Sequence, residues 1–227
     1  MFSYSLDSCR AAIFDMDGLL LDSENSRMEL FKKACSLHGA VPNMEAYLKC
    51  IGRDTRDGEY ILKQGHGSDF PYDAIMSTRN TLYMEEVRKG TIKIQPGVKE
   101  LLDYLHSKLI PCAVATSTDK ETALKKLQTS DLLHFFSEVI SGEEVPASKP
   151  APDIFLEAAA RLSVNPEKCL VFEDSDNGIR AAVSAGTNPI QVPDLLEPQK
   201  EIKELGHIIV PSLVQATEYL KQTWRKQ

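Results

Sequence analysis

The stretch AAIFDMDGLLLDSE, residues 11–24, decides how the rest of the chain is interpreted. Its apolar run AAIF predicts a buried strand over 11–14. Asp15 follows this strand directly, and Asp17 comes two residues later. Residues i and i+2 of an extended segment point to the same side, so the two carboxylates face one point and repel each other there. Such a pair at a strand end indicates a site at which positive charge is bound.

The composition argues against several classes of protein. The chain has 227 residues, a formal net charge of -7 and no basic stripe with interleaved aromatic residues, so we expect no nucleic-acid partner. Its start lacks a basic region followed by an apolar run, and no apolar stretch approaches the roughly 20 residues that span a bilayer, so we expect no membrane partner. The five cysteines are scattered without a CxxC pair, which is typical of a reducing compartment. We therefore expect a soluble, cytoplasmic, monomeric protein.

Short apolar runs bounded by turns recur along the chain, with helical patterns between them. Runs that are apolar on both faces are typical of strands in a buried parallel sheet. The predicted strands cover residues 11–14, 110–117, 138–141, 168–175, 188–193 and 207–211. The predicted helices between them cover residues 97–108, 119–128, 152–163 and 175–186. This alternation predicts an α/β fold with a Rossmann-like, doubly wound parallel sheet.

One segment interrupts the alternation, because no convincing strand lies between Asp22 and Lys93. Helical patterns cover residues 23–39, 57–65 and 70–90 instead. We therefore expect a core made of residues 1–22 and 93–227, with an inserted all-α helical domain over 23–92.

Polar side chains follow four of the predicted strands. They are Asp15 and Asp17, then Thr116 and Ser117, then Lys149 in the loop after the third strand, and finally Glu173 and Asp174. Ligands of an open parallel sheet bind outside the carboxyl ends of its strands, so these side chains can surround a single point.

The residue types predict the chemistry of that point. Four carboxylates need a cation, and carboxylate oxygens without a soft ligand suit Mg²⁺, which commonly bridges to a phosphate. The Lys149 ammonium and a hydroxyl of Thr116 or Ser117 can hold phosphate oxygens. Once the repulsion is screened, one aspartate can attack phosphorus and form an aspartyl-phosphate, while the second transfers protons.

At this point the chain resembles the haloacid dehalogenase superfamily of phosphotransferases over essentially its full length. The motifs that carry the resemblance are DMDG at 15–18, the Thr116–Ser117 step, Lys149 before Pro150, and EDS at 173–175. The helical insertion matches the α-helical cap domain of that family. The segments DMDGLLLDS, SKPAPDIF and FEDSDNGI are most similar to β-phosphoglucomutase and its close phosphatase relatives.

The resemblance implies a role for each motif residue. Asp15 is expected to be the nucleophile and a metal ligand, and Asp17 the general acid/base with its backbone carbonyl on Mg²⁺. Thr116 and Lys149 are expected to bind the phosphate. Glu173 and Asp174 are expected to hold the metal, directly or through water.

Three arginines of the insertion are candidates for substrate contacts. Arg53 and Arg79 fall where β-phosphoglucomutase has basic residues that face the substrate. Arg27 stands where the mutase has a histidine that assists proton transfer, and an arginine stays protonated and cannot take that part. This favours a phosphatase over a mutase.

Three functions remain open at this stage. The first is a Mg²⁺-dependent phosphatase of a small phosphorylated metabolite, such as a sugar phosphate. The second is β-phosphoglucomutase or a related phosphomutase. The third is a non-catalytic, receiver-like phosphoacceptor module, which the sequence disfavours because receivers carry the accepting aspartate on a middle strand and need only about half this length.

Overall fold

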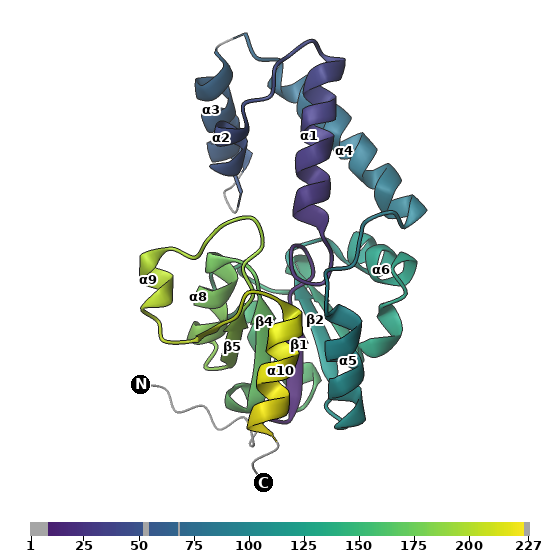
Figure 1. Cartoon of the computed structure of the whole chain (residues 1–227), viewed down its shortest axis with the longest axis vertical. Helices are drawn as coiled ribbons and strands as arrows, with labels where there is room; N and C mark the ends of the chain where they lie inside the picture. Colours follow the sequence, from purple (N-terminus) through teal and green to yellow (C-terminus); the bar gives the residue numbers. More distant parts are fainter. Residues whose placement is uncertain (1–8, 52–54, 68, 225–227) are drawn as a thin grey trace. The chain divides into compact units, whose positions relative to one another are not determined.

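The computed structural model describes residues 9–51, 55–67 and 69–224, and the chain divides into two compact units (Figure 1). The first, which we call the sheet unit, comprises Met1–Asp22 and Lys93–Gln227. The second, the helical unit, comprises Ser23–Ile92.

Six parallel strands form the sheet unit, in the order β3-β2-β1-β4-β5-β6. Their bounds are β1 Ala11–Phe14, β2 Cys112–Thr116, β3 Glu138–Ser141, β4 Cys169–Glu173, β5 Asn188–Gln191 and β6 Ile208–Ile209. Each predicted run contains one of these strands, and the predicted α/β class with a Rossmann-like parallel sheet is confirmed. The strand that ends in the aspartate pair, β1, lies between β2 and β4.

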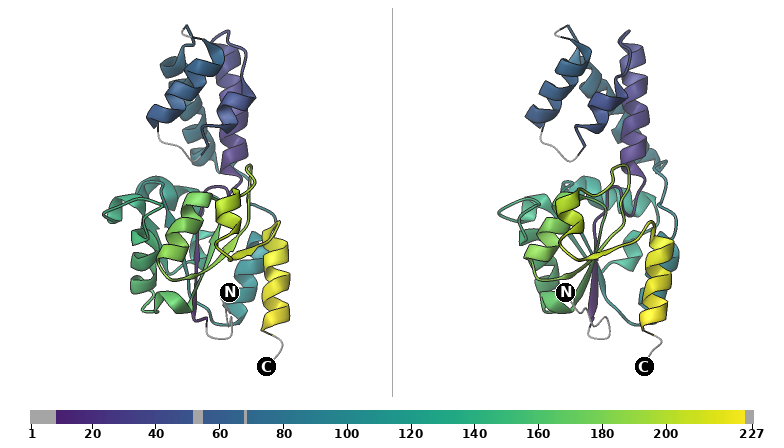
Figure 2. Two further views of the ribbon diagram at one scale, coloured as in Figure 1. Left: turned by 90° about the vertical axis from the view of Figure 1, so that its left-hand side faces the viewer. Right: turned by 60° about the vertical axis from the view of Figure 1, so that its left-hand side comes forward.

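Helices cover both faces of this sheet (Figure 2). They are α5 Val98–Ser107, α6 Lys120–Thr129, α7 Asp153–Arg161, α8 Asp176–Ser184, α9 Lys200–Lys203 and α10 Leu213–Thr223, with 3₁₀ turns η2 Leu133–Phe135, η3 Gly142–Glu144 and η4 Pro166–Lys168. Helices α7 and α8 lie on one face, and α5 packs against α10 on the other. The sequence patterns missed α9 and α10.

Alternate side chains of β1 enter the two halves of the core, as the pleat of a strand requires. Ile13 packs with Phe155 of α7 and Ala181 of α8 in one apolar cluster. Phe14 stacks on Phe172 of β4, with their ring centroids 4.7 Å apart. Because both faces of β1 are buried, its position and register are fixed. Asp15, which follows Phe14, is therefore held at the edge of the sheet.

The described residues of the helical unit contain helices and no strand. These helices are α1 Ser23–Leu37, α2 Met44–Leu48, α3 Thr55–His66 and α4 Tyr72–Lys89. Long helices α1 and α4 pack together, and Phe31 of α1 stacks on Tyr47 of α2 at 4.6 Å. Helix α2 was not predicted, because five residues are too few to show a helical repeat. Nowhere among the described residues is there a helix long and apolar enough to cross a membrane.

Candidate active site

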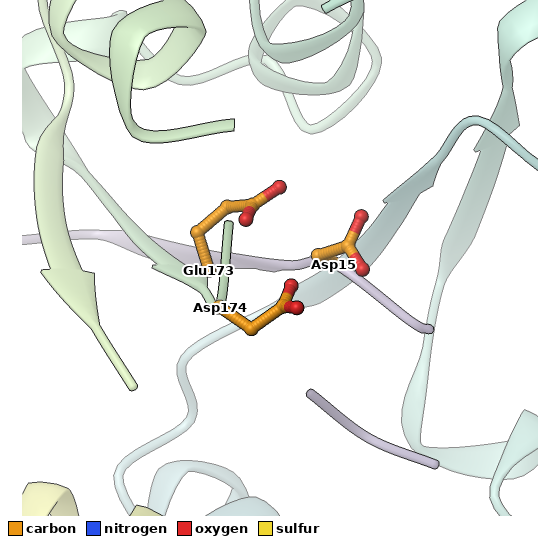
Figure 3. A group of neighbouring side chains, drawn as sticks. All are labelled: Asp15, Glu173 and Asp174. Carbon is orange, nitrogen blue, oxygen red and sulfur yellow. The ribbon is translucent and has the colours of Figure 1, made fainter. Parts of the chain in front are cut away.

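Three carboxylates meet at the edge of the sheet where the parallel strands end (Figure 3). Asp15 follows β1, Glu173 is the last residue of β4, and Asp174 comes next. One oxygen from each side chain lies within 4.8 Å of one from each of the others. The backbone N–H of Asp15 donates to the carbonyl of Phe172, which ties the two strand ends together at 3.0 Å. The pairing of β1 with β4 is therefore what brings residues 158 positions apart to one place.

Lys149 lies between two of these carboxylates. Its Nζ is 2.5 Å from Oδ1 of Asp15 and 2.7 Å from Oε1 of Glu173. It also donates to the carbonyl of Ala115 at 3.1 Å, and its side chain is 7% exposed. The three protons of the ammonium thus have three acceptors in the protein, so a bound phosphate must share or replace one of them.

The electrostatics show that Lys149 does not balance the cluster. Burial raises the pKa of Asp15 to about 7, against the opposing effect of Lys149 and with a further contribution from Glu173. Burial also raises the pKa of Asp174 well above its usual value, and Glu173 and Asp15 add to the effect. Burial alone would lower the pKa of Lys149, but Asp15 and Glu173 outweigh it and raise that pKa. More positive charge is needed before Asp15 and Asp174 are both fully ionised at neutral pH.

This donor set fits a hard divalent cation such as Mg²⁺. All three candidate ligands are carboxylate oxygens, which Mg²⁺ prefers. Asp15 and Asp174 carry the two raised carboxyl pKa values that such a cation would lower. Together with Glu173 beside them, they are the side chains that would hold the ion.

Glu173 is the most constrained member of the cluster. Its Oε2 accepts from the backbone N–H of Ser175 at 2.8 Å and from the Ser175 hydroxyl at 2.9 Å. The same hydroxyl accepts from the N–H of Gly178 and so caps α8. A Cβ at Gly178 would lie 1.8 Å from the Glu173 carboxyl carbon, so only glycine leaves room for this arrangement.

Gly18 makes room for Asp174 in a similar way. Its φ of +88° is in the left-handed region, and a Cβ there would lie 2.5 Å from Oδ2 of Asp174. The carbonyl of Gly18 accepts from Gln95, which also donates to Asp194. The charge of Asp194 contributes to the raised pKa of Asp174. Gln95 and Asp194 were not among the predicted site residues.

The second aspartate of the motif is held by different partners. Oδ1 of Asp17 is 2.6 Å from Nζ of Lys126 on α6, and Oδ2 accepts from the Thr118 hydroxyl at 2.7 Å. The charge of Asp17 still adds to the raised pKa of Asp15, so the two carboxylates remain electrostatic neighbours. Sequence reasoning missed both partners, although Lys126 stands on the buried stripe of α6 with Ala123 and Leu127.

The loop after β2 presents its hydroxyls unequally. The Thr116 side chain is buried at the strand end, and its Oγ1 accepts from the backbone N–H of Thr118 at 3.1 Å. Ser117 is exposed, and Asp119 is the residue that caps α6. Of these residues, Thr118 is the one whose hydroxyl donates to the Asp17 carboxylate.

The three arginines proposed for the substrate belong to the helical unit, and Arg53 lies outside the described residues. Arg27 stacks over the Tyr83 ring, 3.9 Å from its centroid, and its Nε is 3.7 Å from Glu24. Arg79 hydrogen-bonds to Tyr47, and burial lowers the pKa of its guanidinium. A cavity of about 830 Å³ within the helical unit is lined by Arg79, Tyr47 and Tyr72, among other residues.

Comparisons with known proteins agree with this geometry. The family model "Haloacid dehalogenase-like hydrolase" matches residues 12–192. A "Phosphorylated carbohydrates phosphatase" of Thermotoga maritima is 34% identical over 215 residues, which are 93% of this chain and 98% of that protein. "Fructose-1-phosphate phosphatase" of Escherichia coli is 30% identical over 181 residues, 79% of this chain and 94% of that one.

Solved structures are similar over nearly the whole chain. The crystal structure of a "putative beta-phosphoglucomutase" from Thermotoga maritima has a TM-score of 0.78 and 32% identity, and the match covers 94% of this chain and 99% of that one. A hydrolase from Deinococcus radiodurans has a TM-score of 0.82 at 22% identity, with 96% and 97% of the two chains covered, and this likeness supports the fold.

Proposed function

The chain belongs to the haloacid dehalogenase-like hydrolases and is a phosphohydrolase, and we propose that it hydrolyses a small sugar phosphate with Mg²⁺ through an aspartyl-phosphate intermediate. The observation that carries this proposal is the cluster of Asp15, Asp174 and Glu173 at one strand edge, with Lys149 buried among them. Family membership as a phosphohydrolase also removes the alternative of a non-catalytic, receiver-like module.

In the proposed reaction, Asp15 is the nucleophile. An oxygen of its carboxylate bonds to phosphorus while the bond from phosphorus to the leaving oxygen of the sugar breaks. Asp17 gives its proton to that leaving oxygen, and the sugar departs as an alcohol. Water then attacks phosphorus, its proton passes to Asp17, and inorganic phosphate leaves as the Asp15 carboxylate is restored.

The other residues hold the charges in place. Lys149 and the hydroxyls of the Thr116–Ser117 step are proposed to bind phosphate oxygens. Asp15, Glu173 and Asp174, with the backbone carbonyl of Asp17, are proposed to hold Mg²⁺. When bound, the cation neutralises carboxylate charge and draws electron density from the phosphate, which eases attack by an anion.

Recognition of the sugar is assigned to the helical unit, as a cap. Arg79 and Tyr47 line its cavity and offer a cation and a hydroxyl to a polar substrate. Arg27 and Arg53 complete the proposed set. The permanent charge of Arg27 favours hydrolysis over the mutase alternative, because an arginine cannot transfer protons as a histidine can. That alternative keeps one supporting observation, the similarity to a solved structure named as a mutase.

The proposal places the protein in the cytoplasm as a monomer. The five cysteines, which all lie among the described residues, form no disulfide, and this suits a reducing compartment. The net charge of -7 suits a small-molecule substrate better than a nucleic acid.

Release of phosphate from a substrate panel tests the function. The protein is incubated with Mg²⁺ and phosphorylated sugars, polyols and nucleotides, and free phosphate is measured. We expect release from one or a few sugar phosphates and none after chelation of the metal. Conversion of β-glucose 1-phosphate to glucose 6-phosphate in the presence of a bisphosphate primer, without release of phosphate, would establish the mutase instead.

A further inference from the structure

A lysine is buried on α6 in a place where an apolar residue would be expected. Lys126 lies between the core residues Ala123 and Leu127 on the inner stripe of the helix, and its side chain is 0% exposed. Its neighbour Lys125 is exposed, as a helical lysine normally is. Removing an ammonium from water is costly unless a counter-charge with good geometry is present.

The counter-charge of Lys126 is the second aspartate of the motif. Nζ of Lys126 lies 2.6 Å from Oδ1 of Asp17, across 109 positions of sequence. The Thr118 hydroxyl donates to the other oxygen, Oδ2, at 2.7 Å. Each oxygen of this carboxylate therefore has a fixed donor, and the plane of the carboxylate is set by two elements, α6 and the loop after β2.

The two lysines contact three of the four carboxylates of the site. Lys149 contacts Asp15 and Glu173, whereas Lys126 contacts Asp17. Without Lys126, the Asp17 carboxylate would still be repelled by Asp15, and it would lose the ion pair that holds it toward α6. A buried ion pair is weak evidence for stability, because an apolar side chain of similar volume usually serves the fold as well. Its value here lies in fixing an orientation.

We propose that Lys126 is a positioning residue which, with Thr118, orients the Asp17 carboxylate for proton transfer to the leaving oxygen. This inference rests on the proposed phosphatase function. Proton transfer requires the donor oxygen within hydrogen-bond reach of the leaving oxygen, and misplacement by about 1 Å can reduce a rate by about 10²-fold.

The test uses leaving groups that differ in their need for a proton. An alkoxide such as that of a sugar leaves poorly unless it is protonated, whereas p-nitrophenolate leaves readily without a proton. The value of kcat/KM is measured with Mg²⁺ for a series of alkyl and aryl phosphates. The proteins compared are wild type, Lys126→Met, Thr118→Val and Asp17→Asn, with Lys125→Met as the matched surface control.

For Lys126→Met we expect kcat/KM to fall about 10²-fold for alkyl phosphates and only a few-fold for p-nitrophenyl phosphate. Thr118→Val should likewise lower kcat/KM more for alkyl phosphates than for p-nitrophenyl phosphate. This variant still tests the proposal if Lys126→Met folds poorly. The double variant Asp17→Asn/Lys126→Met should be no slower than Asp17→Asn alone, because the lysine acts through the aspartate. Lys125→Met should match the wild type.

The outcomes separate the two proposals. Equal losses for alkyl and aryl phosphates in both Lys126→Met and Thr118→Val would mean a purely structural role and would overturn this inference alone. The inference would also be overturned if kcat/KM of the double variant were far below that of Asp17→Asn alone. Failure of the wild type to release phosphate from any member of this series or of the sugar-phosphate panel would overturn the proposed function, and the inference with it.

Discussion

Asp15→Asn should abolish turnover and yet stabilise the metal-free protein at alkaline pH. Without the carboxylate the proposed aspartyl-phosphate cannot form, so we expect kcat to fall by at least about 10⁴-fold. The fold should survive, because Lys149 keeps its ion pair with Glu173 at 2.7 Å. The substitution also removes one of the three carboxylates that repel one another at the strand edge.

The size of the stability effect follows from the raised carboxyl pKa. Burial, with Glu173 and Asp17 adding to it and Lys149 opposing it, takes the pKa of Asp15 from 3.8 to about 7. A carboxyl whose pKa is higher in the folded state supports the fold at low pH, and this support is lost as the pH rises toward 7. Between pH 5 and pH 8 the loss from this group amounts to about 3 kcal/mol. Asparagine does not titrate, so the variant escapes that loss.

The assay is thermal and urea unfolding at pH 5 and pH 8, with a chelator present, for the wild type and Asp15→Asn. The difference in free energy of unfolding, variant minus wild type, should become more positive by about 3 kcal/mol from pH 5 to pH 8, or about 6–12 °C in Tm. Asp103→Asn, an exposed position on α5, is the control and should show no such trend. A difference that stays constant or becomes more negative with rising pH would refute the assignment of Asp15 as a buried, repelled carboxylate. Substantial turnover by folded Asp15→Asn would refute its role as nucleophile.

Three further predictions concern the same site. Lys149→Met leaves Asp15 and Glu173 without their shared cation, so turnover should be lost and urea unfolding at pH 8 without metal should show a destabilisation of about 3–5 kcal/mol. Gly178→Ala should displace the Glu173 carboxylate, reduce Mg²⁺ affinity measured by calorimetry and lower the free energy of unfolding by about 1–3 kcal/mol. Gly58→Ala is the control, because a Cβ there meets only ordinary contacts, and it should stabilise α3 by about 0.5–1 kcal/mol. Equal Mg²⁺ affinity in the two variants would contradict the inference that a Cβ at position 178 displaces Glu173. Added Mg²⁺ should raise Tm more at pH 8 than at pH 5, because the carboxyls with raised pKa bind protons at the lower pH; a larger rise at pH 5 would count against carboxylate ligands.

The strand-end residues could be predicted because they depend on local patterns. AAIF, CAVAT and CLVFE are apolar runs buried in a parallel sheet, and the carboxyl ends of such strands share one edge. The gathering of Asp15, Glu173 and Asp174 therefore needs only the correct strand order. Strand pairing then fixes the backbone positions of these three residues. Their side chains are too short to carry the carboxylates far from the sheet edge.

The residues that were missed depend on the reach of long side chains and on space. Lys126 lies eight residues after Thr118 and contacts Asp17 only because α6 packs back against β3. Gln95 bridges Gly18 and Asp194, which are far apart in sequence. The requirement for glycine at position 178 depends on a contact with Glu173 across the first turn of α8, which no local pattern records.

The charges of the site explain why a divalent cation would complement its two lysines. Asp15, Asp17, Glu173 and Asp174 contribute four negative charges when ionised, and Lys149 and Lys126 contribute two positive ones. These six side chains therefore leave a net charge of about -2, which a divalent cation balances. A phosphate ester would otherwise approach a site of its own sign. Lys126 pairs with Asp17, and Lys149 with Asp15 and Glu173. A divalent cation would therefore act chiefly on Asp15 and Asp174, whose carboxyl pKa values are raised in spite of Lys149.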